Sequence, residues 1–153
     1  MKQNIIIIFI VFLMPLVVKA QSPDTINRTD VKGNKQGYWI KRYPGGNIQY
    51  EGYFLDNQPA GTFKRYYEND TIQSILFYSK NREEADAIFF HRNGFIASTG
   101  KYISRKKEGK WSFYSSVIEG YLVLEENYRN NLRQGLSVKY YPDKTMAEEI
   151  WYK

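Results

Sequence analysis

Beyond the first twenty residues, apolar side chains do not recur at the i, i+3, i+4 and i+7 positions of an amphipathic helix. Apolar and aromatic residues instead form short runs, as in 38–43, of about the usual length of a β-strand. Glycine, asparagine or aspartate separate these runs, and all three tolerate the positive φ of tight turns. The pattern predicts an all-β protein of β-hairpins with no substantial helix after residue 20. The predicted turns lie at Pro44–Asn47, Glu68–Asp70, Arg92–Gly94 and Pro142–Lys144, and at Asp56–Asn57, Lys80–Asn81, Ser104–Arg105 and Asn130–Asn131.

The chain repeats itself with a period of 24 residues, and we count the first residue of each repeat as position 0. Glycine holds position 0 in four of five repeats, and the fourth repeat carries two extra residues, expected within 115–120 in a lengthened hairpin loop. Position 0 is occupied by Gly37, Gly61, Ala85, Gly109 and Gly135. Position 2 is occupied by Trp39, Phe63, Ala87, Trp111 and Ser137. Position 17, counted back from Gly135 in the fourth repeat, is aromatic throughout: Phe54, Tyr78, Tyr102, Tyr128 and Tyr152.

Each repeat contains two predicted strands and therefore one hairpin. One hairpin cannot bury enough apolar surface alone, whereas hairpins stacked side by side bury their aromatic columns against the next repeat. We therefore expect an elongated, single-layer antiparallel sheet of five stacked hairpins. The predicted repeats are 37–60, 61–84, 85–108, 109–134 and 135–153, preceded by a lead-in at 21–36.

The first twenty residues have the layout of a secretory signal peptide. Lys2 supplies a positive start, Ile5–Val18 is an apolar run, and Val18 and Ala20 occupy the small-residue positions before a cleavage site. The alternative is an N-terminal membrane anchor, which needs about 20 apolar residues to span the bilayer. The run is shorter than that, so we expect cleavage after Ala20 and export to the periplasm, the cell surface or the medium.

The motif Gly-x-Trp-x-x-x-Tyr-Pro-x-Gly, followed by Tyr-Glu-Gly-x-Phe, resembles the MORN repeat in the variant form common in bacterial secreted proteins. It is formed by Gly37, Trp39, Tyr43, Pro44, Gly46, Tyr50, Glu51, Gly52 and Phe54, with weaker copies in the later repeats. The resemblance implies stacked hairpins that serve in scaffolding and protein association, with lipid head-group contact proposed for some eukaryotic members. Bacterial variants are sometimes labelled antitoxin-like. The family shares no catalytic residue, so the resemblance implies no enzyme.

Composition narrows the function classes. The 153 residues include no cysteine, which excludes a disulfide scaffold, a thiol nucleophile and a cysteine-based zinc site. Cleavage after Ala20 removes two lysines from the 22 basic residues and leaves 20 against 16 acidic ones, a mature net charge of +4. Acidic pairs such as Glu83-Glu84 interrupt the basic residues, so we expect no nucleic-acid partner.

The candidate catalytic residues have structural explanations. His91, the only histidine, falls in a column that holds tyrosine in three other repeats, Tyr43, Tyr67 and Tyr141, and Ser115 in the fourth. A hydrolase pairing His91 with Ser74 or Ser98 remains a remote alternative, because no Gly-x-Ser-x-Gly motif is present. The recurring carboxylates Glu51, Glu125 and Glu149 suit cross-strand pairing with lysine or arginine better than glycosidase chemistry. We expect no catalytic residue, no metal site, no cofactor and no small-molecule substrate.

The aromatic residues at position 5 form the candidate interaction face. An odd number of residues, three, separates position 5 from position 2. Along a regular strand the position 5 side chains should therefore point to the opposite face of the sheet from the position 2 column. A single-layer sheet leaves such a face uncovered, and exposed aromatic patches mark interaction sites. The face comprises Tyr66, Phe90, Tyr114 and Tyr140. We expect association with a protein partner or with itself; the alternative is an envelope protein that binds carbohydrate or lipid head groups, for which a membrane surface is possible but not required.

Overall fold

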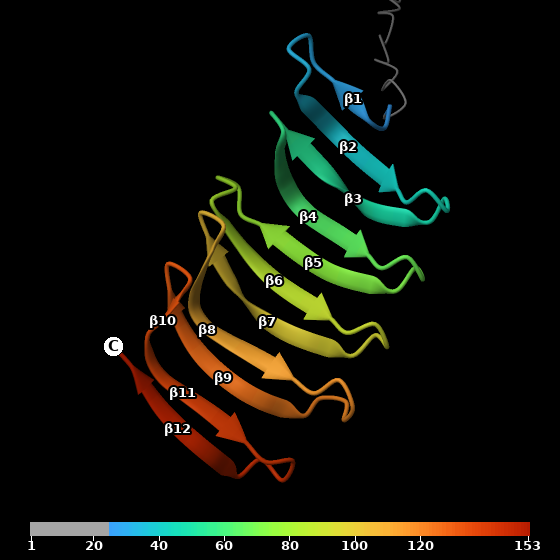
Figure 1. Ribbon diagram of the computed structural model, residues 1–153. Helices are drawn as coiled ribbons and strands as arrows, with labels where there is room; N and C mark the ends of the chain where they lie inside the picture. Colours follow the sequence, from blue (N-terminus) through green and yellow to red (C-terminus); the bar gives the residue numbers. More distant parts are fainter. Residues whose placement is uncertain (1–24) are drawn as a thin grey trace, which may run out of the picture.

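The computed structural model describes residues 25–153, so the expected signal peptide lies outside the described residues. The described chain forms one antiparallel sheet (Figure 1). Its strands are β1 (Arg28–Thr29), β2 (Lys35–Arg42), β3 (Ile48–Leu55), β4 (Gln58–Tyr66), β5 (Ile72–Tyr78), β6 (Glu84–Phe90), β7 (Ile96–Ile103), β8 (Lys106–Tyr114), β9 (Leu122–Arg129), β10 (Leu132–Arg133), β11 (Gly135–Tyr140) and β12 (Met146–Tyr152).

Each strand pairs with the strand that follows it in sequence, except that β9 continues the sheet through β11 and β10 pairs only with β9. The five hairpins are therefore β2–β3, β4–β5, β6–β7, β8–β9 and β11–β12. Figure 1 shows them stacked in one open, twisted layer, and no helix occurs within residues 25–153. The all-β expectation is confirmed. Across that same range, no helix is long and apolar enough to cross a membrane.

Turn chemistry explains why the strands end where they do. Between successive hairpins, both residues of the turns Asp56–Asn57, Ser104–Arg105 and Asn130–Asn131 have positive φ. This is the type I′ geometry that matches the twist of a hairpin. The asparagine also links neighbouring repeats, since Oδ1 of Asn131 accepts a hydrogen bond from the Lys107 amide at 2.6 Å. The longer loop expected within 115–120 is present, because β8 ends at Tyr114 and β9 begins at Leu122.

The position 0 glycines all adopt the left-handed conformation that disfavours other residues. Gly61 and Gly109 do so where the pairing of β3 with β4 and of β7 with β8 shifts register. The third repeat has Ala85 instead, and β5 pairs with β6 without any shift. The third repeat thus joins its predecessor by a regular ladder, whereas the second and fourth repeats join theirs through a bulge.

Packing is concentrated on one side of the sheet, which we call the indole face because it carries Trp39 and Trp111. Trp111 is 1% exposed and lies over Gly100, where an added Cβ would overlap the indole ring. Phe63 lies over Gly52 in the same way. At the joint between these two, the large residue is on the other strand of the pair, because Leu76 stands where Gly52 and Gly100 do and faces the small Ala87. Large and small residues therefore compensate each other across neighbouring repeats.

Candidate functional site

Two aromatic clusters lie on the indole face, and a lysine covers each of them. Lys35 Nζ lies 4.6 to 5.3 Å from three ring centroids of the first cluster, and Lys107 Nζ lies 4.5 to 5.0 Å from three ring centroids of the second. Such cation–π contacts stabilise partly buried lysines. The first cluster is Trp39, Tyr50, Phe54 and Phe63. The second is Phe89, Tyr102, Trp111, Phe113 and Tyr128.

Burial among these rings lowers the pKa of Lys107, although the nearby Glu126 carboxylate opposes the effect. Lys35 and Lys107 occupy equivalent places, because 72 residues, or three periods, separate them. The residues at the same place, two positions before Gly61 and Ala85, are Pro59 and Glu83, neither of which covers the rings with a cation. The indole face is therefore open between the two clusters.

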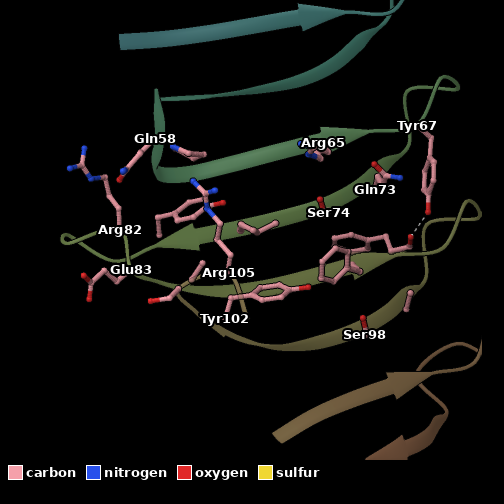
Figure 2. A pocket seen from close by; sticks show the side chains of 18 of the residues that line it. Gln58, Arg65, Tyr67, Gln73, Ser74, Arg82, Glu83, Ser98, Tyr102 and Arg105 are labelled. Carbon is pink, nitrogen blue, oxygen red and sulfur yellow. Dashed lines mark hydrogen bonds between the residues drawn. The ribbon is translucent and has the colours of Figure 1, made fainter. Parts of the chain in front are cut away.

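A groove of about 1030 Å³ occupies this open stretch (Figure 2). Cross-strand rows of β4, β5, β6 and β7 form it, with Tyr78, Ala85 and Tyr102 directly opposite one another. Its floor is well packed, because Ser74 and Ala85 are buried. The groove is therefore a concave surface above a closed layer of side chains.

Three arginines reach this groove from separate segments. Arg65 lies on β4, Arg82 in the turn between β5 and β6, and Arg105 in the turn between β7 and β8. Figure 2 shows Arg82 and Arg105 at the turn end, with Arg65 further along the strands. Among residues 25–153, none of these guanidinium groups lies within 4.0 Å of a carboxylate. The single acidic residue of the lining is the exposed Glu83, so the groove is positively charged.

The positive charges of two groove arginines act on the pKa of Tyr78. Burial raises the pKa of Tyr78, and the positive charges of Arg105 and Arg65 partly offset this effect. Burial likewise raises the pKa of Tyr102. Arg82 Nη1 also donates a hydrogen bond to the Leu55 carbonyl at 3.1 Å, which anchors it at the turn end. The groove thus combines neutral phenol rings with guanidinium groups.

A different arrangement occupies the opposite face of the sheet. The carboxylate of Glu51 accepts hydrogen bonds from the hydroxyls of Tyr38 and Tyr66, both at 2.7 Å, and Lys64 Nζ lies 3.8 Å away. The hydrogen bond from Tyr66 lowers the pKa of Glu51, against the opposing effect of burial. Burial and the bond to Glu51 raise the pKa of Tyr38 to about 12. The carboxylate joins the first and second repeats.

The same contact recurs at the other end of the array. Tyr140 donates to Glu125 at 3.0 Å, and Lys110 Nζ lies 3.2 Å from the same carboxylate. At the equivalent places between the second and third repeats stand Ile75 and Phe90, which have no side-chain hydrogen-bonding groups. The tyrosine–glutamate contact is therefore made at the first and the last joint between repeats and not at the joint between the second and third.

The expected interaction face is half-buried at all four positions: Tyr66, Phe90, Tyr114 and Tyr140. Two of its hydroxyls are bonded to glutamates, so its role as a binding surface stays a prediction. More exposed aromatic residues lie at position 16, which the sequence analysis did not single out: Tyr53, Phe77 and Trp151. The signal was available, since these residues recur at the repeat period on the side opposite the position 17 column.

The Glu51 contacts predict an acid-sensitive joint. The pKa of Glu51 is lower in the folded protein than its ordinary value of 4.5, so the unfolded chain binds more protons in acid. The stability supplied by the carboxylate is present above pH 4.5 and is lost as the pH falls through the lower, folded-state pKa. We expect Glu51→Gln to flatten the fall in unfolding free energy below pH 4.5, measured by urea denaturation at several pH values. Glu119→Gln, in an exposed loop, serves as the control, and identical profiles for Glu51→Gln and the wild type would contradict the assignment.

His91 takes part in a ladder of hydrogen bonds at the loop edge of the sheet. Tyr43 and Tyr67 each donate to a backbone carbonyl of the next repeat, at 2.9 and 2.8 Å. In the third repeat, His91 takes the place of the tyrosine, and its Nε2 lies 3.0 Å from the carbonyl oxygen of Tyr114 in the fourth repeat. A carbonyl oxygen only accepts hydrogen bonds, so Nε2 carries the proton. Ser115 holds this place in the fourth repeat, and Tyr121 from the lengthened loop donates there instead.

Replacing His91 tests this ladder. His91→Phe leaves the Tyr114 carbonyl without its donor, and we expect a loss of about 1 kcal/mol in unfolding free energy. His91→Tyr introduces the donor that neighbouring repeats use, and we expect a change within about 0.5 kcal/mol. Urea denaturation measures both variants. Equal destabilisation by the two substitutions would show that the hydrogen bond does not hold the repeats together.

The three residues of the hydrolase alternative lie in one groove but are not hydrogen-bonded to one another. Ser74, Ser98 and His91 all line the groove. In residues 25–153, however, no hydrogen bond connects either serine to His91, whose Nε2 is bonded to the Tyr114 carbonyl. Ser74 is also 2% exposed. A nucleophile needs a base within hydrogen-bond reach, and this arrangement does not provide one.

No group of three or more metal-ligating side chains occurs in the part of the chain that the structure describes. Comparison of the chain with protein-family models finds no match, and a search of curated proteins finds none either. The MORN resemblance therefore stays an expectation from the motif.

Proposed function

We propose that this protein is an exported, non-enzymatic scaffold that associates with a protein partner by adding a strand to β12. Within residues 25–153, β12 pairs with β11 on one side only. An unpaired edge strand presents backbone donors and acceptors to another extended chain. Large apolar side chains accompany these groups, since Met146 and Ile150 are exposed and Trp151 is 73% exposed. This exposed, apolar edge is the observation that carries the proposal.

The backbone groups that face outward follow from the neighbouring contacts. Asn127 Nδ2 donates to the Leu136 carbonyl at 2.8 Å, so this carbonyl points toward β9. Backbone groups alternate along a strand, and those of Ser137 therefore point toward β12 and its partner Ile150. By the same alternation, the amides and carbonyls of Glu149 and Trp151 point away from β11. They are the groups available to an added strand.

The side chains favour a partner strand that combines apolar and basic residues. Trp151 offers a ring beside the open edge, and rings of this kind are enriched in interfaces. Glu149 stands opposite Val138 and so has no basic cross-strand neighbour on β11. A lysine or arginine on the added strand would supply that pair.

The test is affinity capture from the envelope fraction with the tagged mature protein and two variants. Glu149→Pro removes an outward-facing amide at an edge position where proline is tolerated. Glu149→Gln removes the same charge and keeps the amide, so it is the matched control. We expect species that bind the wild type and that Glu149→Gln binds at most about fivefold more weakly, because it lacks only the charge pair. Glu149→Pro should bind the same species at least about tenfold more weakly than the wild type.

Other results decide against this mode of binding. Retention of all species by Glu149→Pro, with circular dichroism showing an intact sheet, would exclude strand addition at β12. The absence of any species specific to the wild type would contradict association as the function. A doubled mass in sedimentation that Glu149→Pro abolishes would identify a second copy of this chain as the added strand.

A further inference from the structure

We propose that the groove on the indole face binds an acidic saccharide, with its carboxylates on Arg65, Arg82 and Arg105 and its sugar rings against Tyr78 and Tyr102. This site is distinct from the β12 edge, so the inference goes beyond protein association. It depends on the shape of the groove, the convergence of the arginines and the polarity of the remaining lining.

The groove is a built feature of the third repeat. Three substitutions coincide there: Ala85 replaces the glycine at position 0, Ala87 replaces the ring at position 2, and Glu83 replaces the covering lysine. Leu76 fills part of the space beside Ala87, which is only 2% exposed. The floor of the groove is therefore packed, so side chains do not close the volume above it, and a ligand can occupy that volume.

The arginines indicate a ligand with more than one negative charge. Placing three like charges around one groove is unfavourable until an anion is bound. Elsewhere on this face the arrangement differs, since Arg133 Nε lies 2.9 Å from the buried carboxylate of Glu126. Guanidinium groups match carboxylates by paired hydrogen bonds. Because Arg65 lies away from the other two in Figure 2, an extended ligand with several carboxylates fits better than a single small ion.

The rest of the lining indicates a sugar. Tyr78 and Tyr102 flank Ala85 from β5 and β7, so their rings stand on both sides of a narrow floor. Rings of this kind offer an apolar surface with a wet hydroxyl, which suits the mixed faces of a sugar. Gln58, Gln73 and Ser98 add neutral donors and acceptors for hydroxyl groups. Inorganic phosphate has no apolar face to pack against the tyrosine rings, and a neutral sugar has no negative charge to pair with the arginines.

Isothermal titration calorimetry with tetragalacturonate, a linear oligomer of four uronic acids, tests the proposal. We expect saturable binding that weakens as salt rises, and weaker or no binding of the neutral maltotetraose. Arg105→Gln should weaken the binding of tetragalacturonate about tenfold. Arg129→Gln, an exposed arginine at the end of β9 and outside the groove, is the matched control and should keep the wild-type affinity.

A second variant fills the groove without removing any arginine. In the fourth repeat, Trp111 lies over Gly100, with its ring centroid 5.0 Å from that of Tyr102. The double substitution Leu76→Gly and Ala87→Trp copies this pair one repeat earlier, and the indole then lies between Tyr78 and Tyr102. We expect a loss of tetragalacturonate binding, while circular dichroism and a cooperative urea transition show that the sheet is intact.

Several outcomes would overturn the inference. Equal affinity for maltotetraose would show that the arginines play no part, and equal affinity for inorganic phosphate would show that the rings play none. Failure of tetragalacturonate to bind at millimolar concentration, or full binding by the filled variant, would exclude the groove as the site. Glu149→Pro separates this inference from the proposed function, because it should leave tetragalacturonate binding unchanged.

Discussion

Trp111→Ala should lower the free energy of unfolding by about 3–5 kcal/mol, the usual cost of truncating a buried aromatic side chain to alanine. The indole is 1% exposed and packs against rings from four strands, including Tyr102 and Tyr128. Its loss opens a cavity between the third and fourth repeats, and the rigid sheet closes it only in part. Urea denaturation followed by circular dichroism measures the change.

The chain provides its own control for this prediction. Trp151 is 73% exposed on β12, so Trp151→Ala removes the same atoms with little loss of buried contacts. We expect a change within about 0.5 kcal/mol. Similar losses for the two tryptophans would mean that burial on the indole face does not determine stability.

Gly100→Ala should have the second largest effect, because overpacking should lower the free energy of unfolding by about 1–3 kcal/mol. The backbone of Gly100 is outside the left-handed region, so alanine is not excluded by φ. The obstacle is the Trp111 indole, since an added Cβ would overlap the ring and lie 2.7 Å from its Cγ. Gly45→Ala is the control, because no atom lies within 4 Å of a Cβ built there, and its effect should stay within about 0.5 kcal/mol.

A double-mutant cycle isolates the contact between these two residues. Once Trp111→Ala has removed the ring, Gly100→Ala should cost less than about 0.5 kcal/mol. The coupling energy is then most of the cost of Gly100→Ala alone. Additive effects in the double variant would show that the glycine is required for some reason other than the close approach of the indole.

The period of 24 residues was enough to predict most of the fold. Position 0 glycines, turn residues such as Asp56–Asn57 and the aromatic position 17 column recur in sequence and mark the hairpins that the structure has. The turn expected at Lys80–Asn81 differs from the others, because it is longer, between Tyr78 and Glu84, and its only positive φ is at Arg82. In four of the five repeats the position 17 residue stands opposite position 0, as Phe54 stands opposite Gly37. Repetition makes such features visible, because every copy solves the same packing problem.

The groove was not predictable by the same means, because it arises where the repetition fails. Its arginines lie at different positions of their repeats: Arg65 is on β4, and Arg82 and Arg105 are in two different turns. They therefore do not recur at one position of the 24-residue period. Compensation between Leu76 and Ala87 is likewise invisible until the register of β5 and β6 is known. For the position 5 aromatics, nothing in the repeat pattern indicated that Glu51 and Glu125 would accept hydrogen bonds from two of their hydroxyls.

The alternation of large and small residues at the joints limits how the array can change its length. Excision of 61–84 would bring Ala87 opposite Gly52 and leave a void, whereas excision of 85–108 would force Trp111 against Leu76. Excision of both hairpins together, 61–108, sets Trp111 over Gly52, which is the kind of pair already present between Phe63 and Gly52. The smallest module that can be removed from this stack, or duplicated within it, is therefore two hairpins of 48 residues.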